Sequence, residues 1–238
     1  MSSEYIPERA MFIFAHPDDI EFGSAGTAAK WAKNGCEVTY VLITDGNVGS
    51  HEMGMTREKL AEIRRAEQTA AADTVGAQCV FLGYDDGHLQ PTLALRKDLV
   101  RQIRKYKPNI VVCGDPSFYY SETYINHPDH RAAGQAALEA VFPASEMALV
   151  FPELADEGLT PHKVNYVYLS FNRGKANLYI DITETIELKI EVLRQHVSQL
   201  TDWDPEERMK EWAADTGKKV GFQYAEAFFK VPLKEVEM

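Results

Sequence analysis

The sequence contains few cysteines, and this scarcity excludes a disulfide scaffold. Its 238 residues include three of them, Cys36, Cys79 and Cys113, each at the edge or end of an apolar run. Three cysteines cannot all pair, so we expect buried, reduced thiols in a cytosolic protein. Because no two are spaced Cys-x-x-Cys, the sequence also argues against a thiolate zinc site.

Long apolar runs and basic clusters are also lacking. No stretch approaches the ~20 apolar residues that span a bilayer, and the first residues lack the basic and apolar segments of a secretory signal. The formal net charge is −11, and Lys and Arg are not clustered, which argues against a nucleic-acid partner. We therefore expect a cytoplasmic protein with no membrane span.

The chain is long enough to bury the core of one large α/β domain. Its 45% hydrophobic and 26% charged residues are ordinary for a globular protein. Since neither an internal repeat nor a low-complexity linker interrupts it, we predict a single domain over residues 1–238.

Strand-like and helix-like segments alternate along the first 142 residues. Apolar, β-branched runs predict strands at 11–15, 37–44, 79–82 and 109–113. Amphipathic or Ala-rich segments predict helices at 24–34, 56–74, 93–106 and 129–142. This alternation predicts an α/β fold with a doubly wound, mostly parallel sheet and helices on both faces.

The C-terminal third is more irregular. We expect strands at 165–171 and 178–182, a helix from 183 to about 200, and a shorter helix over 205–214. The Trp-bearing segment 203–212 is interpreted as packing or as a subunit contact in a homo-oligomer.

Two segments rich in His, Pro and Asp carry the chemistry. The first, 15–21 (AHPDDIE), follows the first predicted strand, and the second, 127–130 (HPDH), follows the fourth. In open α/β sheets, ligands bind outside the carboxyl ends of the strands. We therefore expect both segments to meet at one rim, together with the polar residues that follow the second and third strands, Asp45, Gly46, Asp85, Asp86 and His88.

This set of residue types fits a metallohydrolase. Two imidazoles and one carboxylate leave a coordination position open for water, as catalytic zinc requires. Adjacent residues on a turn point in different directions, so one of Asp18 and Asp19 would bind the metal while the other faces the water. Of His127 and His130, only one needs to be a ligand. The other, if cationic, would stabilise a tetrahedral oxyanion or protonate a leaving amine.

The segments AHPDDIEFG and HPDHRAAG resemble the two signature motifs of the LmbE-like N-acetylglucosamine deacetylases, the PIG-L (phosphatidylinositol-glycan class L) superfamily. The resemblance implies a Rossmann-like fold and zinc-dependent hydrolysis of an acetamide on a glucosamine-type sugar. It makes His16, Asp19 and His130 the metal ligands and Asp18 the general base. It also makes His127 the electrostatic stabiliser or acid, with Asp129 as its orienting partner.

The likeness covers two expected substrate-binding residues, and a third lies where the chain departs from the family. Arg64 lies in an Arg-x-x-Glu element and His196 in a C-terminal His-x-Ser-Gln element, both similar to family segments. Tyr124 belongs to the stretch 117–126, which is longer and more aromatic than in many relatives, so its ring could stack on a sugar. The chain departs from the family at Asn47, where relatives often carry Glu, and this leaves the substrate open.

Two other functions fit parts of the same pattern. A set of two His and one carboxylate also holds Fe(II) for oxygen chemistry, and the same fold could serve as a non-catalytic ligand-binding module. The spare carboxylate of Asp18 favours hydrolysis, because oxygen activation does not need it. We therefore expect a zinc enzyme, or one using another divalent transition metal, whose partner is a small amino-sugar conjugate.

Overall fold

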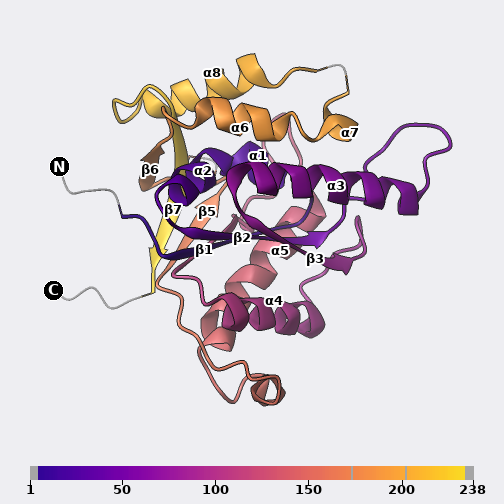
Figure 1. Cartoon of the computed structure of the whole chain (residues 1–238), viewed down its shortest axis with the longest axis vertical. Helices are drawn as coiled ribbons and strands as arrows, with labels where there is room; N and C mark the ends of the chain where they lie inside the picture. The colour runs from indigo at the N-terminus through magenta and orange to yellow at the C-terminus, as the bar shows by residue number, and fades with distance from the viewer. Residues whose placement is uncertain (1–4, 173, 202, 234–238) are drawn as a thin grey trace.

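The computed structural model describes residues 5–172, 174–201 and 203–233. Within them, seven strands form one sheet in the order β3-β2-β1-β4-β5-β7-β6 (Figure 1). The strands are β1 Arg9–Phe14, β2 Glu37–Thr44, β3 Gln78–Tyr84, β4 Ile110–Gly114, β5 Tyr166–Ser170, β6 Leu178–Asp181 and β7 Ala225–Pro232.

Strands β1 to β5 run parallel to one another, as predicted. β1 lies between β2 and β4, so the order of the strands reverses at this point. In doubly wound sheets such a reversal opens a crevice at the carboxyl ends of the strands. β7 pairs antiparallel with both β5 and β6 and completes the sheet.

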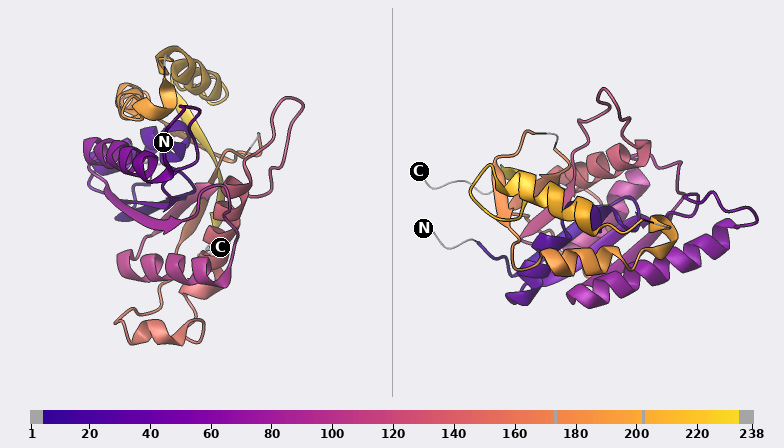
Figure 2. Two further views of the ribbon diagram at one scale, coloured as in Figure 1. Left: turned by 90° about the vertical axis from the view of Figure 1, so that its right-hand side faces the viewer. Right: turned by 90° about the horizontal axis from the view of Figure 1, so that it is seen from above.

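Helices cover both faces of the sheet, as predicted (Figures 1 and 2). One face carries α1 Asp19–Gly23, α2 Ala25–Lys33, α3 Arg57–Val75, α6 Ile186–Leu193, α7 Val197–Leu200 and α8 Glu206–Gly217. The other carries α4 Leu93–Tyr106, α5 Pro128–Glu139, the π-helical segment η1 Ala140–Ser145 and the 3₁₀ segment η2 Pro152–Ala155.

The central strand β1 is buried on both sides, which explains its unbroken apolar sequence. Phe12 and Phe14 pack into the core beneath α1, α2 and α6, whereas Met11 and Ile13 pack into the core beneath α4 and α5. Successive residues of a strand point to opposite faces, so a continuous apolar run serves both cores.

Capping residues fix the ends of the long helix α3 where the sequence places them. The side chain of Thr56 accepts a hydrogen bond from the backbone N–H of Lys59, and Gly76 ends the helix at φ 81°. Glycine adopts this left-handed conformation without steric cost.

The C-terminal third differs from the sequence prediction in three respects. The helix expected from 183 to about 200 is interrupted between α6 and α7, and α8 continues to Gly217 rather than ending at 214. The break turns His196 into the interior, a tertiary contact that periodicity does not reveal. Strand β7 was not predicted, because the buried Glu226 interrupts its apolar pattern. Among the described residues, no helix is both long and apolar enough to cross a membrane.

Candidate active site

The two His-Pro-Asp segments meet at the crevice beside β1. The first follows the end of β1 and leads into α1, while the second forms the start of α5. Gly134 lets α5 lie close to the end of β4, since a Cβ atom there would come within 2.4 Å of the Gly114 carbonyl oxygen. The parallel strands thus bring together side chains that are more than one hundred residues apart, as the sequence predicts.

His16 and His130 direct one ring nitrogen each toward the same point. His16 Nδ1 lies 3.2 Å from His130 Nε2. The carboxylate of Asp19 completes the group, with Oδ1 3.0 Å from His130 Nε2 and Oδ2 3.6 Å from His16 Nδ1. Asp19 is held in place by the backbone N–H of His16, which donates to Oδ2 at 2.9 Å.

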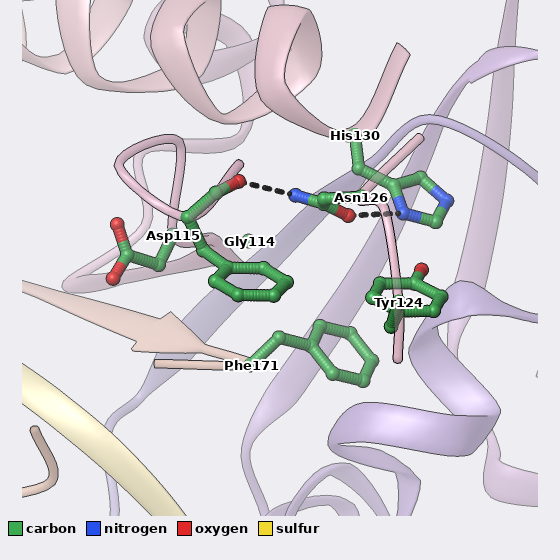
Figure 3. Close-up of a pocket in the computed structure, with 7 residues that line it drawn as sticks. Gly114, Asp115, Tyr124, Asn126, His130 and Phe171 are labelled. Carbon is green, nitrogen blue, oxygen red and sulfur yellow. Dashed lines mark hydrogen bonds between the residues drawn. The ribbon is translucent and has the colours of Figure 1, made fainter. Parts of the chain in front are cut away.

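The remaining ring nitrogens of these histidines each lie close to another side chain. His16 Nε2 lies 3.0 Å from Asp86 Oδ1, and His130 Nδ1 lies 3.3 Å from the carboxamide oxygen of Asn126 (Figure 3). Such partners fix the tautomer of a metal-binding histidine. Sequence reasoning placed Asp86 only on the rim and gave Asn126 no role.

The electrostatics of the cluster favour a cation. Burial alone would lower the pKa of His16, but its hydrogen bonds to Asp129, Asp19 and Asp86 raise that pKa well above its usual value. Burial alone would raise the pKa of Asp19, but the charge and hydrogen bond of His130 hold it well below its usual range. Concentrated negative charge of this kind attracts a proton or a metal ion.

Besides His16, Asp19 and His130, two overlapping groups in the described chain present ligand atoms within 4.8 Å of one another. One is His16, His127 and His130, and the other is His16, Asp86 and Asp129. In the second group, Asp86 accepts a hydrogen bond from the N–H of Val48, and Asp129 accepts hydrogen bonds from backbone N–H groups. On the other side of His16, two imidazoles and the Asp19 carboxylate place their atoms 3.0–3.6 Å apart, so that side is the better site for a metal.

Asp18 lies beside this cluster in a strained conformation. Its φ is 94°, a left-handed value that is uncommon for residues other than glycine. Its backbone N–H donates to Gln68 Oε1 at 3.1 Å, and Arg64 Nη2 lies 3.1 Å from its Oδ2. Burial raises the pKa of the Asp18 carboxyl to about 6, and the charge of Arg64 opposes this rise. A carboxyl with such a pKa can exchange protons near neutral pH.

His127 is half-exposed at the edge of the cluster. Its Nδ1 accepts the backbone N–H of Asp129 at 3.2 Å, so a neutral ring carries its proton on Nε2. Burial and the neighbouring His16 and His130 lower its pKa, which favours that neutral ring over the cationic form considered from the sequence.

Asp129 is positioned differently from the expected partner of His127. Its Oδ1 lies 4.0 Å from His127 Nδ1, too far for a hydrogen bond. Instead the carboxylate accepts the N–H of Gly87 at 2.7 Å and that of Leu89 at 3.3 Å, and lies 3.5 Å from His16 Nε2. The backbone N–H of Asp129 therefore orients His127, while the Asp129 carboxylate connects the loop after β3 to His16.

Arg64 and His196, the other two expected substrate contacts, are both buried in this structure. Arg64 donates to the carbonyl oxygens of Pro17 and Gly46 in addition to its pairing with Asp18. His196 is fully enclosed, with Nε2 3.3 Å from a carboxylate oxygen of Glu21. Arg64 therefore holds the loop after β1, and His196 lies against Glu21 of α1.

Tyr124 lies where a substrate can reach it. The segment 115–127 extends away from the sheet (Figure 2), and within it Tyr120 and Ile125 form an antiparallel bridge. The ring of Tyr124 stacks on Phe118 and borders a cavity that also touches His130 (Figure 3). This places an aromatic wall beside the His16–His130 pair.

The family described as PIG-L, GlcNAc-PI de-N-acetylase, matches residues 11–141, a range that contains both His-Pro-Asp segments. The chain belongs to the PIG-L family. Within this family, it is 33% identical over 231 residues to the diacetylchitobiose deacetylase of Thermococcus kodakarensis, covering 94% of this chain and 84% of that protein. It is 27% identical to a probable N-acetyl-α-D-glucosaminyl L-malate deacetylase 2 of Bacillus anthracis, covering 94% and 96%.

A solved PIG-L relative has the same fold over nearly the whole chain. The N,N'-diacetylchitobiose deacetylase of Pyrococcus horikoshii, in complex with an inhibitor, superposes with a TM-score of 0.87 at 34% identity. The alignment covers 95% of this chain and 84% of that chain. These comparisons confirm the Rossmann-like fold and the family predicted from the two motifs.

Proposed function

We propose that this chain is a metal-dependent N-deacetylase that hydrolyses the acetamide of a small N-acetylglucosamine-type conjugate. His16, Asp19 and His130 would hold the metal, either zinc or another divalent transition ion. The observation that carries the proposal is the 3.2 Å separation of His16 Nδ1 and His130 Nε2. The second nitrogen of each ring faces another side chain, Asp86 or Asn126, so these two nitrogens are the ones left for a metal.

The donor set fits zinc. Zinc binds histidine nitrogen at about 2.0–2.1 Å, so neighbouring ligands of a tetrahedral site lie about 3.3 Å apart. The atoms of His16, Asp19 and His130 are separated by 3.0, 3.2 and 3.6 Å. When bound, the metal would polarise the acetamide carbonyl and lower the pKa of a water molecule.

Asp18 then acts as the general base that takes a proton from the attacking water. Its raised pKa of about 6 keeps it largely ionised at neutral pH yet able to return the proton later. Arg64 and Gln68 hold this side chain and its backbone in the strained geometry described above. Asp18 is thus kept separate from the ligand Asp19.

His127 donates from Nε2 to the oxygen that becomes negatively charged as the carbonyl carbon turns tetrahedral. Donors fixed in advance at such an oxygen stabilise the transition state. The leaving nitrogen then receives the proton that Asp18 took from the water, and the C–N bond breaks to give acetate and the free amine.

Metal content and turnover, measured together, test these assignments. We expect Asp18→Asn to retain one equivalent of metal by elemental analysis while its deacetylation rate falls by about 10²- to 10⁴-fold. His16→Ala and His130→Ala should lose the metal as well as the activity. Loss of metal from Asp18→Asn, or full activity in it, would contradict the roles assigned to Asp18 and Asp19.

Oxygen dependence separates this proposal from an iron oxygenase with the same ligand set. The hydrolase should release acetate from N-acetylglucosamine conjugates at the same rate in an anaerobic chamber as in air. A requirement for oxygen would overturn the proposal.

A further inference from the structure

Two spaces of different size flank His130. The inner cavity, of about 80 Å³, is bordered by Gly114, Phe118, Tyr124, Asn126, His130 and Phe171 (Figure 3). The outer cleft, of about 640 Å³, is bordered among others by Asp19, Phe22, His130, Phe171, Arg208 and Trp212. Phe171 thus borders both spaces and lies beside a candidate metal ligand.

The position of Phe171 is fixed by unusual local structure. It follows the end of β5 directly and has a φ of 55°, a left-handed value that is strained for a bulky residue. Its ring packs edge-on against Phe14 with the ring centres 6.3 Å apart. Gly23 leaves room for the ring, because a Cβ atom there would lie 2.7 Å from it. The strain is retained at a position where the ring faces the active site.

The walls of the inner cavity suit an apolar group. Phe118, Tyr124 and Phe171 supply aromatic surface (Figure 3). The polar groups on the walls are already partnered: Asn126 bonds to His130 and to the Phe118 carbonyl oxygen, and Asp115 accepts the N–H of Ser117.

The size of the inner cavity restricts what it can hold. An apolar cavity of about 150 Å³ accommodates a benzene ring, so about 80 Å³ holds only a few carbon atoms. The outer cleft falls in the ordinary range for small-molecule sites, about 300–1,000 Å³.

An acetamide presents two unlike groups on either side of its carbonyl carbon, a methyl and an amine that carries the sugar. We propose that the inner cavity binds the acyl methyl, that the outer cleft receives the amino sugar, and that Phe171 limits the acyl chain to acetyl. This inference rests on the proposed function, which places the carbonyl beside His16, Asp19 and His130. The ligand of the inner cavity is then a short apolar acyl group.

The test compares N-acetylglucosamine with N-butyrylglucosamine on metal-loaded protein. Phe171→Ala should raise the ratio of kcat/KM for butyryl over acetyl by at least about tenfold, because two methylenes in an apolar pocket change recognition by a few kcal/mol. Phe171→Leu should give an intermediate ratio. Phe22→Ala is the matched control, since Phe22 borders the outer cleft and is absent from the border of the inner cavity.

A second cavity variant and a binding measurement test the same acyl cavity. If Phe171→Ala does not fold, Phe118→Ala enlarges the same cavity from another wall and should change the ratio in the same direction. In an Asp18→Asn background, which turns substrate over slowly, N-butyrylglucosamine should raise the melting temperature more for Phe171→Ala than for the parent protein.

The outcomes separate this inference from the function on which it rests. An unchanged butyryl-to-acetyl ratio in both cavity variants, with an active parent enzyme, would overturn the acyl cavity and leave the deacetylase intact. A parent enzyme that hydrolyses no N-acyl glucosamine conjugate would overturn the proposed function itself.

Discussion

The side-chain oxygen of Gln68 accepts a hydrogen bond of 3.1 Å from the backbone N–H of Asp18, the residue whose φ is 94°. The same carboxamide donates to Glu21 Oε1 at 2.9 Å, and Glu21 in turn faces the buried His196. A buried chain of polar groups therefore supports the proposed base from the side away from the crevice. Gln68 acts as a positioning residue.

Replacing Gln68 with Met should lower kcat about tenfold while leaving KM within twofold and the metal content unchanged. The physical reason is that the Asp18 N–H and Glu21 each lose a buried partner, a cost of about 1–3 kcal/mol that loosens the strained loop. Steady-state kinetics and elemental analysis would measure this. Gln135→Met, at an exposed site on α5, is the control. An unaltered kcat would show that the loop does not need Gln68.

The raised pKa of Asp18 has a consequence for stability. A carboxyl whose folded pKa is about 6, against 3.8 otherwise, stabilises the fold below pH 3.8, and this contribution is lost as the pH rises through 6. Asp18→Asn, tested without metal, should therefore match the parent near pH 4 and exceed its free energy of unfolding at pH 8 by up to roughly 3 kcal/mol.

Urea unfolding of chelator-treated protein across this pH range measures the effect. Asp156→Asn, an exposed site, should show no comparable pH-dependent gain. If the Asp18 variant were less stable than the parent at pH 8, the ionised carboxylate would be a net stabilising group and the assigned sign would be wrong.

Asp86→Asn should weaken zinc binding about 10- to 100-fold, because a neutral amide orients His16 less firmly than a carboxylate does. The hydrogen bond of Val48 to Asp86 can survive this change, which keeps the loop after β2 in place. Competition with a chromophoric chelator gives the zinc affinity. Asp85→Asn, at the exposed neighbouring position, should bind zinc like the parent. Equal affinity in both variants would remove the supporting role of Asp86.

A buried ion pair between Lys189 and Glu226, with Nζ and Oε1 2.6 Å apart, joins α6 to β7. Glu226 also accepts the N–H groups of Gly26 and Thr27 at 3.0 and 2.8 Å. Glu226→Ala should lower the free energy of unfolding by about 3–5 kcal/mol, because it leaves the Lys189 charge buried without its partner.

Denaturant titration checks that value, and Lys189→Met combined with Glu226→Ala should recover part of the loss. Asp215→Ala, which breaks the exposed pair with Lys218, should change the free energy by less than about 1 kcal/mol. Comparable losses from the buried and the exposed pair would contradict this interpretation.

The strands that carry the site were predictable because each is an unbroken apolar run bounded by a turn or a cap. β2 was predicted with its observed bounds, 37–44, and the capping residue Thr56 correctly placed the start of α3. Parallel pairing of β1 with β4 then placed the ends of the two strands that precede the segments 15–21 and 127–130 side by side. The family and the fold followed from residue types and their order.

The hydrogen-bond partners within the site were not predictable in the same way. Asp86 and Asn126 support the two histidines through contacts that depend on loop conformation, which no spacing in the sequence encodes. The burial of Arg64 and His196 likewise depends on tertiary packing that the sequence pattern does not encode. The roles assigned to the catalytic and metal-binding residues stay predictions until the variants above are measured.

The contact between Glu226 and Gly26 joins residues 200 positions apart. During synthesis, the first His-Pro-Asp segment leaves the ribosome early, but the carboxylate that anchors the helix following it is added near the end of the chain. Contacts between such distant residues form slowly, because a large loop must close first. The start of α2 therefore gains its carboxylate partner only after β7 has joined the sheet.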